Sequence, residues 1–255
     1  MTDLTGRVAL VTGGSRGVGR AIALGLAADG ADVAVNYRRD EAAAQEVVSE
    51  IEALGRKAFA YGASVDDYDQ NAEMVAQIQA DLGDVGILVN NAGIASRGQS
   101  VVDTEPAELQ RVLGVHALGP HYLARLILPG MRKQTRGDII MISSAATRSL
   151  GANGAPYNMG KTAMEALAFT LAKEERQFDI RVNIVAPGLV ETEMGRRLMK
   201  ATAGVDDLRQ LDAAMPFGRV CQPDDVANVV RFLVSPANSY LTGERVYCDG
   251  GGRVG

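Results

Sequence analysis

Short apolar runs alternate with longer Ala-rich stretches along the whole chain. The apolar runs have the length and β-branched content of strands, and the stretches between them have the composition of helices. The runs that predict strands are RVALVTG, ADVAVNY, KAFAYGA, GILVNNAG, GDIIMISS, IRVNIVAPG and ERVYCDGG. Because these runs are apolar throughout rather than at alternate positions, they predict a parallel sheet covered by helices on both faces.

The order of the elements predicts a single domain over residues 1–255. Helices are expected between successive strands, including a long helical region around 104–133. Glycine or Asn-Gly marks most junctions, and we find no linker, low-complexity tract or internal repeat. The expected fold class is therefore α/β, a Rossmann-like doubly wound parallel sheet of about seven strands.

Composition excludes several classes of protein. With 47% hydrophobic and 22% charged residues, the chain can bury a sizeable core. A net charge of −5 without a basic block disfavours nucleic acid and anionic membranes as partners, and the longest apolar runs are strand-length. The N-terminus lacks the order of a secretory signal, and Cys221 and Cys248 match no metal-ligand spacing. We expect a cytoplasmic protein with reduced thiols and no metal site.

A glycine cluster, VTGGSRGVG, joins the first strand to the first helix. Gly13, Gly17 and Gly19 allow a tight turn, a close approach of the backbone to a ligand and tight packing of helix on strand. The N-terminus of the helix then offers free N–H groups to a pyrophosphate. A simple tight turn would also explain glycines at this spacing, but the position between strand and helix favours a phosphate site.

A second candidate lies in GAPYNMGKTAMEAL, where Tyr157 and Lys161 are four residues apart. Residues i and i+4 share one face of a helix, so the phenol and the ammonium can point at the same spot. Taken alone, the pair is weak evidence, because an ordinary solvated helix face explains this spacing better. Ser144, at the end of the fifth strand, lies 13 residues before Tyr157.

The ordered set of motifs resembles the short-chain dehydrogenase/reductase family. The matching features are TGGSRGVG at 12–19, NNAG at 90–93, Ser144, Tyr157 with Lys161, and PGLVET at 187–192. The resemblance runs from Arg7 to about Gly252 and is nearest to 3-oxoacyl-thioester (acyl-carrier-protein) reductases. It implies an oxidoreductase that transfers hydride between a nicotinamide and a carbonyl or secondary alcohol.

The resemblance also implies roles for the catalytic residues. Tyr157 would give its proton to the substrate oxygen, or take it in the reverse direction. A free phenol titrates near ~10, and the neighbouring Lys161 ammonium is expected to lower that pKa. Lys161 would also hold the nicotinamide ribose, and Ser144 would hydrogen-bond the substrate oxygen. Ser143 is a rival, but the spacing to Tyr157 favours Ser144.

His116 stands where many family members have a catalytic Asn. In the family, the main-chain carbonyl at that position holds a water that links the lysine to solvent. Pro120 has no N–H to donate to the carbonyl of residue 116, which would leave this carbonyl free. Our hypothesis is that the main-chain carbonyl of His116 still holds this water, while the imidazole takes over the orienting role of the Asn. A packed, neutral histidine without a role is the alternative.

The residues after the second strand favour NADP(H) over NAD(H). An NAD enzyme usually carries an acid there for the ribose 2′-hydroxyl, but this chain has Tyr37 followed by Arg38 and Arg39, with no carboxylate before Asp40. Arg16, in the glycine turn, can add another guanidinium. Paired guanidiniums suit a 2′-phosphate. Arg38 and Arg39 could also belong to a plain polar loop.

The resemblance assigns further cofactor contacts along the chain. Ser64 stands where the family tends to place an Asp near the adenine, with Asp66 two residues on. The remaining expected contacts are Ser15 and Val18 in the glycine turn, Val65 after the third strand, Asn91, Ala92 and Gly93 after the fourth, and Pro187, Gly188, Val190 and Thr192 after the sixth.

The substrate and the assembly are less constrained. The insertion at about 190–215 is expected to cover the substrate, which could be an acyl thioester, a small ketone, a polyol or a steroid alcohol. An acidic carrier protein would need a basic patch, which AKEERQFD does not obviously supply. The resemblance implies a homotetramer.

Other classes remain open. A non-catalytic NADP(H)-sensing regulator is one alternative, although Tyr157, Lys161 and Ser144 are all present. A sugar-nucleotide epimerase would need a longer chain and a different glycine spacing. Enoyl reductases of the superfamily typically place Tyr and Lys further apart.

Overall fold

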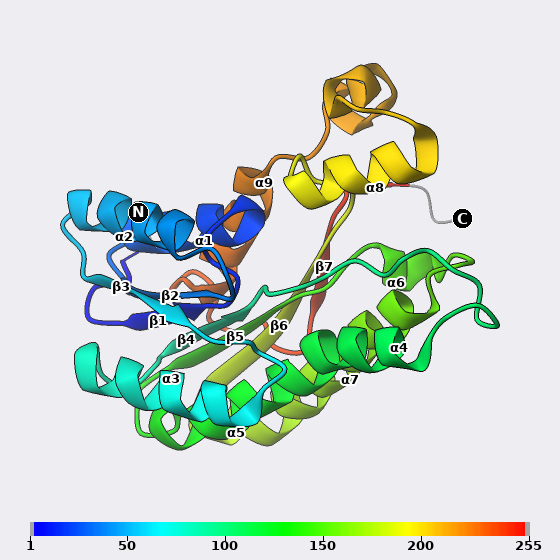
Figure 1. Ribbon diagram of the computed structural model, residues 1–255. Helices are drawn as coiled ribbons and strands as arrows, with labels where there is room; N and C mark the ends of the chain where they lie inside the picture. The colour runs from blue at the N-terminus through cyan, green and yellow to red at the C-terminus, as the bar shows by residue number, and fades with distance from the viewer. Residues whose placement is uncertain (1–2, 253–255) are drawn as a thin grey trace.

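The computed structural model describes residues 3–252, which build one sheet of seven strands in the order β3-β2-β1-β4-β5-β6-β7 (Figure 1). Every neighbouring pair of strands is parallel. The strands are β1 (Val8–Val11), β2 (Asp32–Tyr37), β3 (Ala58–Gly62), β4 (Ile87–Asn90), β5 (Gly137–Ile142), β6 (Ile180–Pro187) and β7 (Arg245–Cys248). The predicted doubly wound α/β fold is confirmed.

Helices cover both faces of the sheet (Figure 1). One face carries α1, α2 and α9, and the other carries α3, α4, α5 and α7. Their bounds are α1 (Gly17–Ala28), α2 (Glu41–Ala53), α3 (Tyr68–Asp81), α4 (Pro106–Leu113), α5 (Gly119–Met131), α6 (Ala146–Ser149), α7 (Ala155–Glu175), α8 (Glu193–Ala203) and α9 (Pro223–Val234). Within residues 3–252, no helix is long and apolar enough to cross a membrane.

The strands are apolar throughout because both faces of the sheet are buried. Ala9 and Val11 of β1 join the apolar layer beneath α1, α2 and α9, while Val8 and Leu10 join the opposite layer. Side chains alternate between the two faces of a strand, so each strand must supply apolar residues at every position. This packing explains the continuous apolar runs in the sequence.

The sheet creates a ligand crevice where its winding direction changes. β1 lies between β2 and β4, so the chain leaves the carboxyl ends of these strands in opposite directions. Parallel α/β sheets bind ligands at this point. The segment expected to cover the substrate, about 190–215, consists of α8 and the 3₁₀ turn η3 (Leu208–Ala214), and α8 stands apart from the sheet in Figure 1. Its role as a lid stays a prediction.

The helical region expected around 104–133 differs from a continuous α-helix. A π-helical turn, η1 (Gly114–Leu118), separates α4 from α5, and the N–H of Gly119 donates to the carbonyl of Gly114. Pro120 cannot donate the α-helical hydrogen bond to His116 because it lacks an N–H. Such wide turns occur frequently at functional sites, and this one carries His116.

Candidate active site

The glycine turn has the backbone that its sequence predicts. Gly13 and Gly17 have φ values of 60° and 53°, in the left-handed region that side chains disfavour. A Cβ on Gly19 would lie 2.2 Å from the carbonyl oxygen of Gly13, so only glycine allows this approach. Helix α1 begins at Gly17, and its first N–H groups lack partners within the helix. The turn is therefore suited to bind a phosphate.

Two polar side chains hold this turn against the neighbouring strands. The Thr12 hydroxyl accepts hydrogen bonds from the N–H groups of Asn91 and Ala92, both at 2.9 Å. The N–H of Gly13 donates to the Asn36 side-chain oxygen at 3.2 Å. These bonds place the segment expected to run along the cofactor beside the glycine turn. We did not assign Thr12 or Asn36 from the sequence.

The segment after β6 also reaches this place. The Thr192 methyl group lies 3.3 Å from where a Cβ on Gly17 would stand, and the Thr192 hydroxyl caps α8 by accepting from Gly195 at 3.1 Å. Val190 is buried and pairs with Cys221 in an isolated β-bridge. Of the remaining predicted contacts, Ser15 is buried and Val18 half-buried in the glycine turn. A Cβ on Gly93 would lie 2.9 Å from Cε1 of His116. The Pro187 carbonyl accepts from Ala145, and the Gly188 N–H donates to Cys248.

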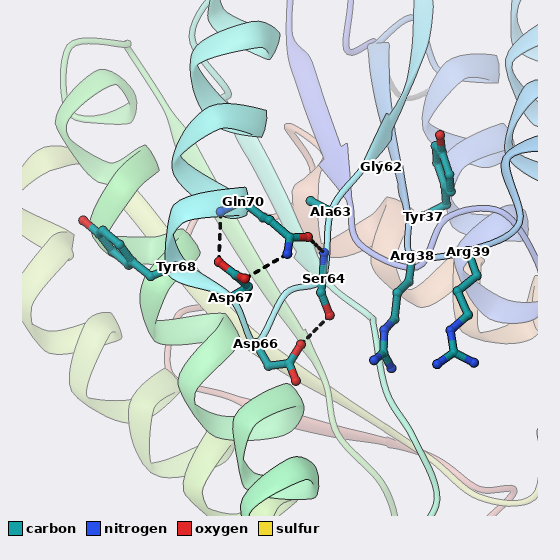
Figure 2. A pocket seen from close by; sticks show the side chains of 10 residues that line it. All are labelled: Tyr37, Arg38, Arg39, Gly62, Ala63, Ser64, Asp66, Asp67, Tyr68 and Gln70. Carbon is teal, nitrogen blue, oxygen red and sulfur yellow. Dashed lines mark hydrogen bonds between the residues drawn. The ribbon is translucent and has the colours of Figure 1, made fainter.

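An open pocket of about 740 Å³ lies beyond the ends of β2 and β3 (Figure 2). Arg38 and Arg39 extend side by side into the open, while the Tyr37 ring points the other way, toward Gly62. Among the described residues, neither guanidinium forms a salt bridge, unlike most arginines of the chain. The full lining is Tyr37, Arg38, Arg39, Gly62, Ala63, Ser64, Asp66, Asp67, Tyr68 and Gln70.

The far wall of this pocket contains the predicted adenine contacts. The Ser64 hydroxyl donates to Asp66 at 2.5 Å, and the Ser64 N–H donates to Gln70 at 2.9 Å. Val65 is buried, and its carbonyl oxygen lies 2.7 Å from where a Cβ on Gly119 would stand. Asp66 therefore supplies the carboxylate at this wall, two residues after the position where the family pattern led us to look.

Arg16 is already paired in this structure. Its two terminal nitrogens contact Asp40 at 2.6 Å and Glu193 at 3.2 Å, and it does not line the pocket. Arg39, not Arg16, is the guanidinium that stands beside Arg38. A direct contact from Arg16 to a cofactor phosphate stays a prediction.

Ser144, Tyr157, Lys161 and His116 come together at the carboxyl end of β5. The Lys161 ammonium lies 5.8 Å from the centre of the Tyr157 ring, and the His116 ring meets that ring edge-on at 5.3 Å between centroids. Ser144 lies close enough to the Tyr157 phenol to lower its pKa, whereas Ser143 donates to a buried carboxylate, Glu165. The structure thus brings the four predicted residues into one cluster, with Lys161 and His116 buried and Ser144 and Tyr157 half-buried, and it separates Ser144 from its rival.

The pKa of Tyr157 is raised, not lowered as we expected from the sequence. Burial of the phenol raises the pKa, and the hydrogen bond with Ser144 offsets only part of that effect. The Lys161 ammonium donates to the carbonyl of Ile142 at 2.7 Å instead of contacting the phenol oxygen. Our expectation was wrong because spacing along a helix does not reveal burial. The phenol holds its proton at neutral pH.

Lys161 is itself strongly perturbed. It is 4% exposed, and burial lowers its pKa to about 7, although the negative charge of Glu165 works in the opposite direction. Small changes in nearby charge therefore decide whether this lysine is protonated at neutral pH.

His116 is buried and neutral, and it contacts the backbone after β4. Burial lowers its pKa to about 3, with the Lys161 charge as a second cause. Its Nε2 lies 2.8 Å from the carbonyl oxygen of Ile94 and 3.3 Å from the Ile94 nitrogen, while Nδ1 has no hydrogen-bond partner. The contact with Ile94 agrees with an orienting role for the imidazole, which stays a hypothesis.

Among residues 3–252, no group of three or more His, Cys, Asp or Glu side chains could hold a metal ion.

Glu165, like Thr12 and Asn36, was not identified from the sequence. Its only signal was its position one turn after Lys161, on the same helical face.

Comparisons with known proteins agree with this geometry. A family model described as enoyl-(acyl carrier protein) reductase matches residues 13–252. A 3-oxoacyl-[acyl-carrier-protein] reductase of Synechocystis sp. is 36% identical over 252 residues, covering 98% of each chain. A short-chain dehydrogenase of Burkholderia cenocepacia in complex with NADP has a TM-score of 0.87 and 36% identity, covering 97% of this chain and 98% of its own. The angucycline C-6 ketoreductase LanV with bound NADP has a TM-score of 0.89 and 34% identity, covering 100% and 98%.

Proposed function

The chain belongs to the short-chain dehydrogenase/reductase family, and we propose that it reduces the carbonyl group of a 3-oxoacyl thioester or a similar ketone with NADPH. The observation that carries the proposal is the cluster that brings Ser144 and a protonated Tyr157 together beside the buried Lys161. The relative from Synechocystis sp. is named for a reaction of this type.

The residues around the crevice fit NADP(H). Gly13 and Gly17 let the backbone of the turn come close to a pyrophosphate, and the helix N-terminus offers N–H donors. Arg38 and Arg39 offer two guanidiniums for a 2′-phosphate. Each guanidinium can form two parallel hydrogen bonds to phosphate oxygens. Two structures similar to this one, the short-chain dehydrogenase of B. cenocepacia and the ketoreductase LanV, hold NADP. When bound, the nicotinamide supplies the hydride.

The side chains of the cluster would handle the proton and the substrate oxygen. Ser144 would hydrogen-bond the carbonyl oxygen and hold it against the Tyr157 phenol. The oxygen becomes strongly basic as it takes up hydride, so Tyr157 can protonate it even though its own pKa is raised. Lys161, when protonated, stabilises the phenolate that remains.

Two further assignments belong to this proposal. The substrate would enter beneath α8 and η3. Two large apolar side chains of α8, Met194 and Leu198, are 44% and 50% exposed. Exposed apolar groups at an entrance suit an acyl chain or another apolar ketone. Assembly as a homotetramer remains an expectation of the family.

The proposal is tested by following NADPH oxidation with purified protein and a substrate panel. The panel contains an acetoacetyl thioester, small and polycyclic ketones, and an enoyl thioester. We expect carbonyl reduction that falls roughly 10²–10⁴-fold in Tyr157→Phe, because the variant lacks the proton donor. Turnover of the enoyl thioester alone would assign the chain to C=C reduction. Tight NADPH binding without any turnover would favour the non-catalytic regulator.

A further inference from the structure

A buried carboxylate lies directly behind the proposed catalytic cluster. Glu165 is on α7, one turn beyond Lys161, and is 3% exposed. One of its oxygens accepts hydrogen bonds from Ser143 at 2.6 Å and Thr147 at 2.8 Å, and the other contacts the Arg245 guanidinium of β7 at 2.5 Å. A buried charge is tolerated only when it is satisfied in this way, so the carboxylate is held as an anion.

These contacts connect Glu165 to the loop that carries Ser144, both before and after that residue. Ser143 precedes it, and the single proton of the Thr147 hydroxyl is shared between two acceptors, the Ser144 carbonyl oxygen at 2.9 Å and Glu165 at 2.8 Å. The backbone of this loop is fixed to β6, because the Ser143 N–H donates to Val185 at 2.8 Å. The side-chain contacts with Glu165 fix the other side of the loop.

The same carboxylate supplies negative charge to Lys161. It raises the pKa of that lysine against the effect of burial. The other titratable or charged groups that face Lys161 or its carboxylate neighbour are Tyr157 on α7, the neutral His116 on η1, and Arg245 on β7. Arg245 therefore opposes the influence of Glu165 from the far side.

We propose that Glu165 is a positioning residue for the reaction, which holds Ser144 through Ser143 and Thr147 and provides the negative charge opposite Lys161. This inference rests on the proposed function, since it assumes that Ser144 and Lys161 act on a substrate. It gives α7 three consecutive turns of related side chains: the proton donor Tyr157, then Lys161, then Glu165.

The same helix contains a matched control. Glu175 is 1% exposed and contacts Arg132 at 2.6 and 2.8 Å, so it is also a buried carboxylate paired with an arginine. It lies at the opposite end of α7, away from Ser144 and Lys161. Glu175→Gln therefore reproduces the loss of a buried ion pair without changing the catalytic cluster.

The test compares the pH dependence of kcat for NADPH-dependent carbonyl reduction. Above neutral pH the wild-type rate should fall as the coupled Tyr157–Lys161 pair loses a proton. Loss of a nearby negative charge makes this deprotonation easier. In Glu165→Gln the alkaline limb, where kcat falls, should therefore lie about one pH unit lower. Arg245→Gln removes the opposing positive charge and should move it toward alkali. Glu175→Gln should leave it unchanged.

Opposite shifts of the alkaline limb in Glu165→Gln and Arg245→Gln would support the charge effect, because a purely structural role would leave the limb in place in both variants. Shifts of the same sign, or none, would overturn it. Ser143→Ala keeps the carboxylate and should lower kcat about tenfold without moving the limb, as expected for a lost hydrogen bond that positions Ser144. Wild-type kcat in Ser143→Ala would overturn the positioning effect.

A measurement that needs no turnover separates this inference from the proposed function. NMR of protein with isotope-labelled lysine reports the pKa of Lys161 directly. A lower value in Glu165→Gln and a higher one in Arg245→Gln would support the charge effect even in a protein that reduces none of the carbonyls. An unchanged value in both would overturn it, whatever the activity. Thermal unfolding of each variant against Glu175→Gln identifies losses that come from folding alone.

Discussion

The two ends of the proposed cofactor crevice are built in different ways. At the end near β5, Lys161 and His116 are 4% and 0% exposed, and burial moves their pKa values to about 7 and about 3. At the other end, Arg38 and Arg39 extend into an open pocket (Figure 2). A charge therefore acts through a low dielectric at one end and through water at the other.

This difference predicts how each end responds to change. Buried groups depend on single neighbours, so one substitution near β5 alters the protonation of several others. Exposed guanidiniums are screened by salt and share the binding of a phosphate, so their effects are smaller and depend on ionic strength. The three predictions below test this contrast, beginning with the largest expected effect.

Arg38→Gln should raise the KM for NADPH about tenfold to hundredfold and leave the KM for NADH nearly unchanged. The reason is the loss of a charge-assisted hydrogen bond to a 2′-phosphate that only NADPH carries. Steady-state kinetics with both cofactors at low and high salt measures this effect, which should shrink as salt rises. Arg20→Gln is the control, since Arg20 is paired with Glu50 on the surface of α1. A wild-type preference for NADH would contradict the assignment.

His116→Asn should flatten the acid side of the stability profile. The pKa of His116 in the folded chain is about 3, below the ordinary value of 6.5. Between these values the unfolded chain takes up a proton that the folded chain does not, so stability is lost as the pH falls, by at most about 1.4 kcal/mol per unit. The variant lacks this contribution, and urea unfolding between about pH 4 and 6, inside that window, measures the difference in slope.

The exposed His121, on the next turn, is the matched control for this prediction. His121→Asn should retain the wild-type slope, whereas equal slopes in wild type and His116→Asn would show that the imidazole is not held neutral. The kcat of His116→Asn also tests the orienting hypothesis. An unchanged kcat would leave His116 as a packed histidine without a specific role.

The sequence predicted the sheet and the glycine turn, and it pointed to the residues of the proposed catalytic cluster, because each depends on local pattern or on order along the chain. Continuous apolar runs require burial on both faces, and the positive φ of Gly13 and Gly17 requires glycine. The raised pKa of Tyr157 and the buried contacts of Glu165 could not be predicted, because they depend on which long-range neighbours exclude water. The π turn at His116 had one signal in the sequence, Pro120, but the contact of its imidazole with Ile94 depends on a long-range neighbour.

The smallest expected effect concerns Arg16, where the sequence suggested a phosphate contact and the structure contains two ion pairs. The side chains of Arg16, Asp40 and Glu193 are 54%, 45% and 49% exposed, so each pair contributes about 0.2–1 kcal/mol. Glu193→Gln should release one nitrogen of Arg16 and tighten NADPH binding by less than about fivefold, an effect that high salt should abolish.

Glu193 also pairs with Arg197 within α8, so Arg197→Gln is the control that disturbs the helix but leaves Arg16 paired. Titration calorimetry with NADPH should then give wild-type affinity for Arg197→Gln and a slightly tighter complex for Glu193→Gln. Weaker binding in Glu193→Gln alone would mean that the contact from Arg16 to α8 helps to hold the cofactor. In that case the open end of the crevice would depend on a specific neighbour, as the buried end does, and the contrast between the two ends would fail.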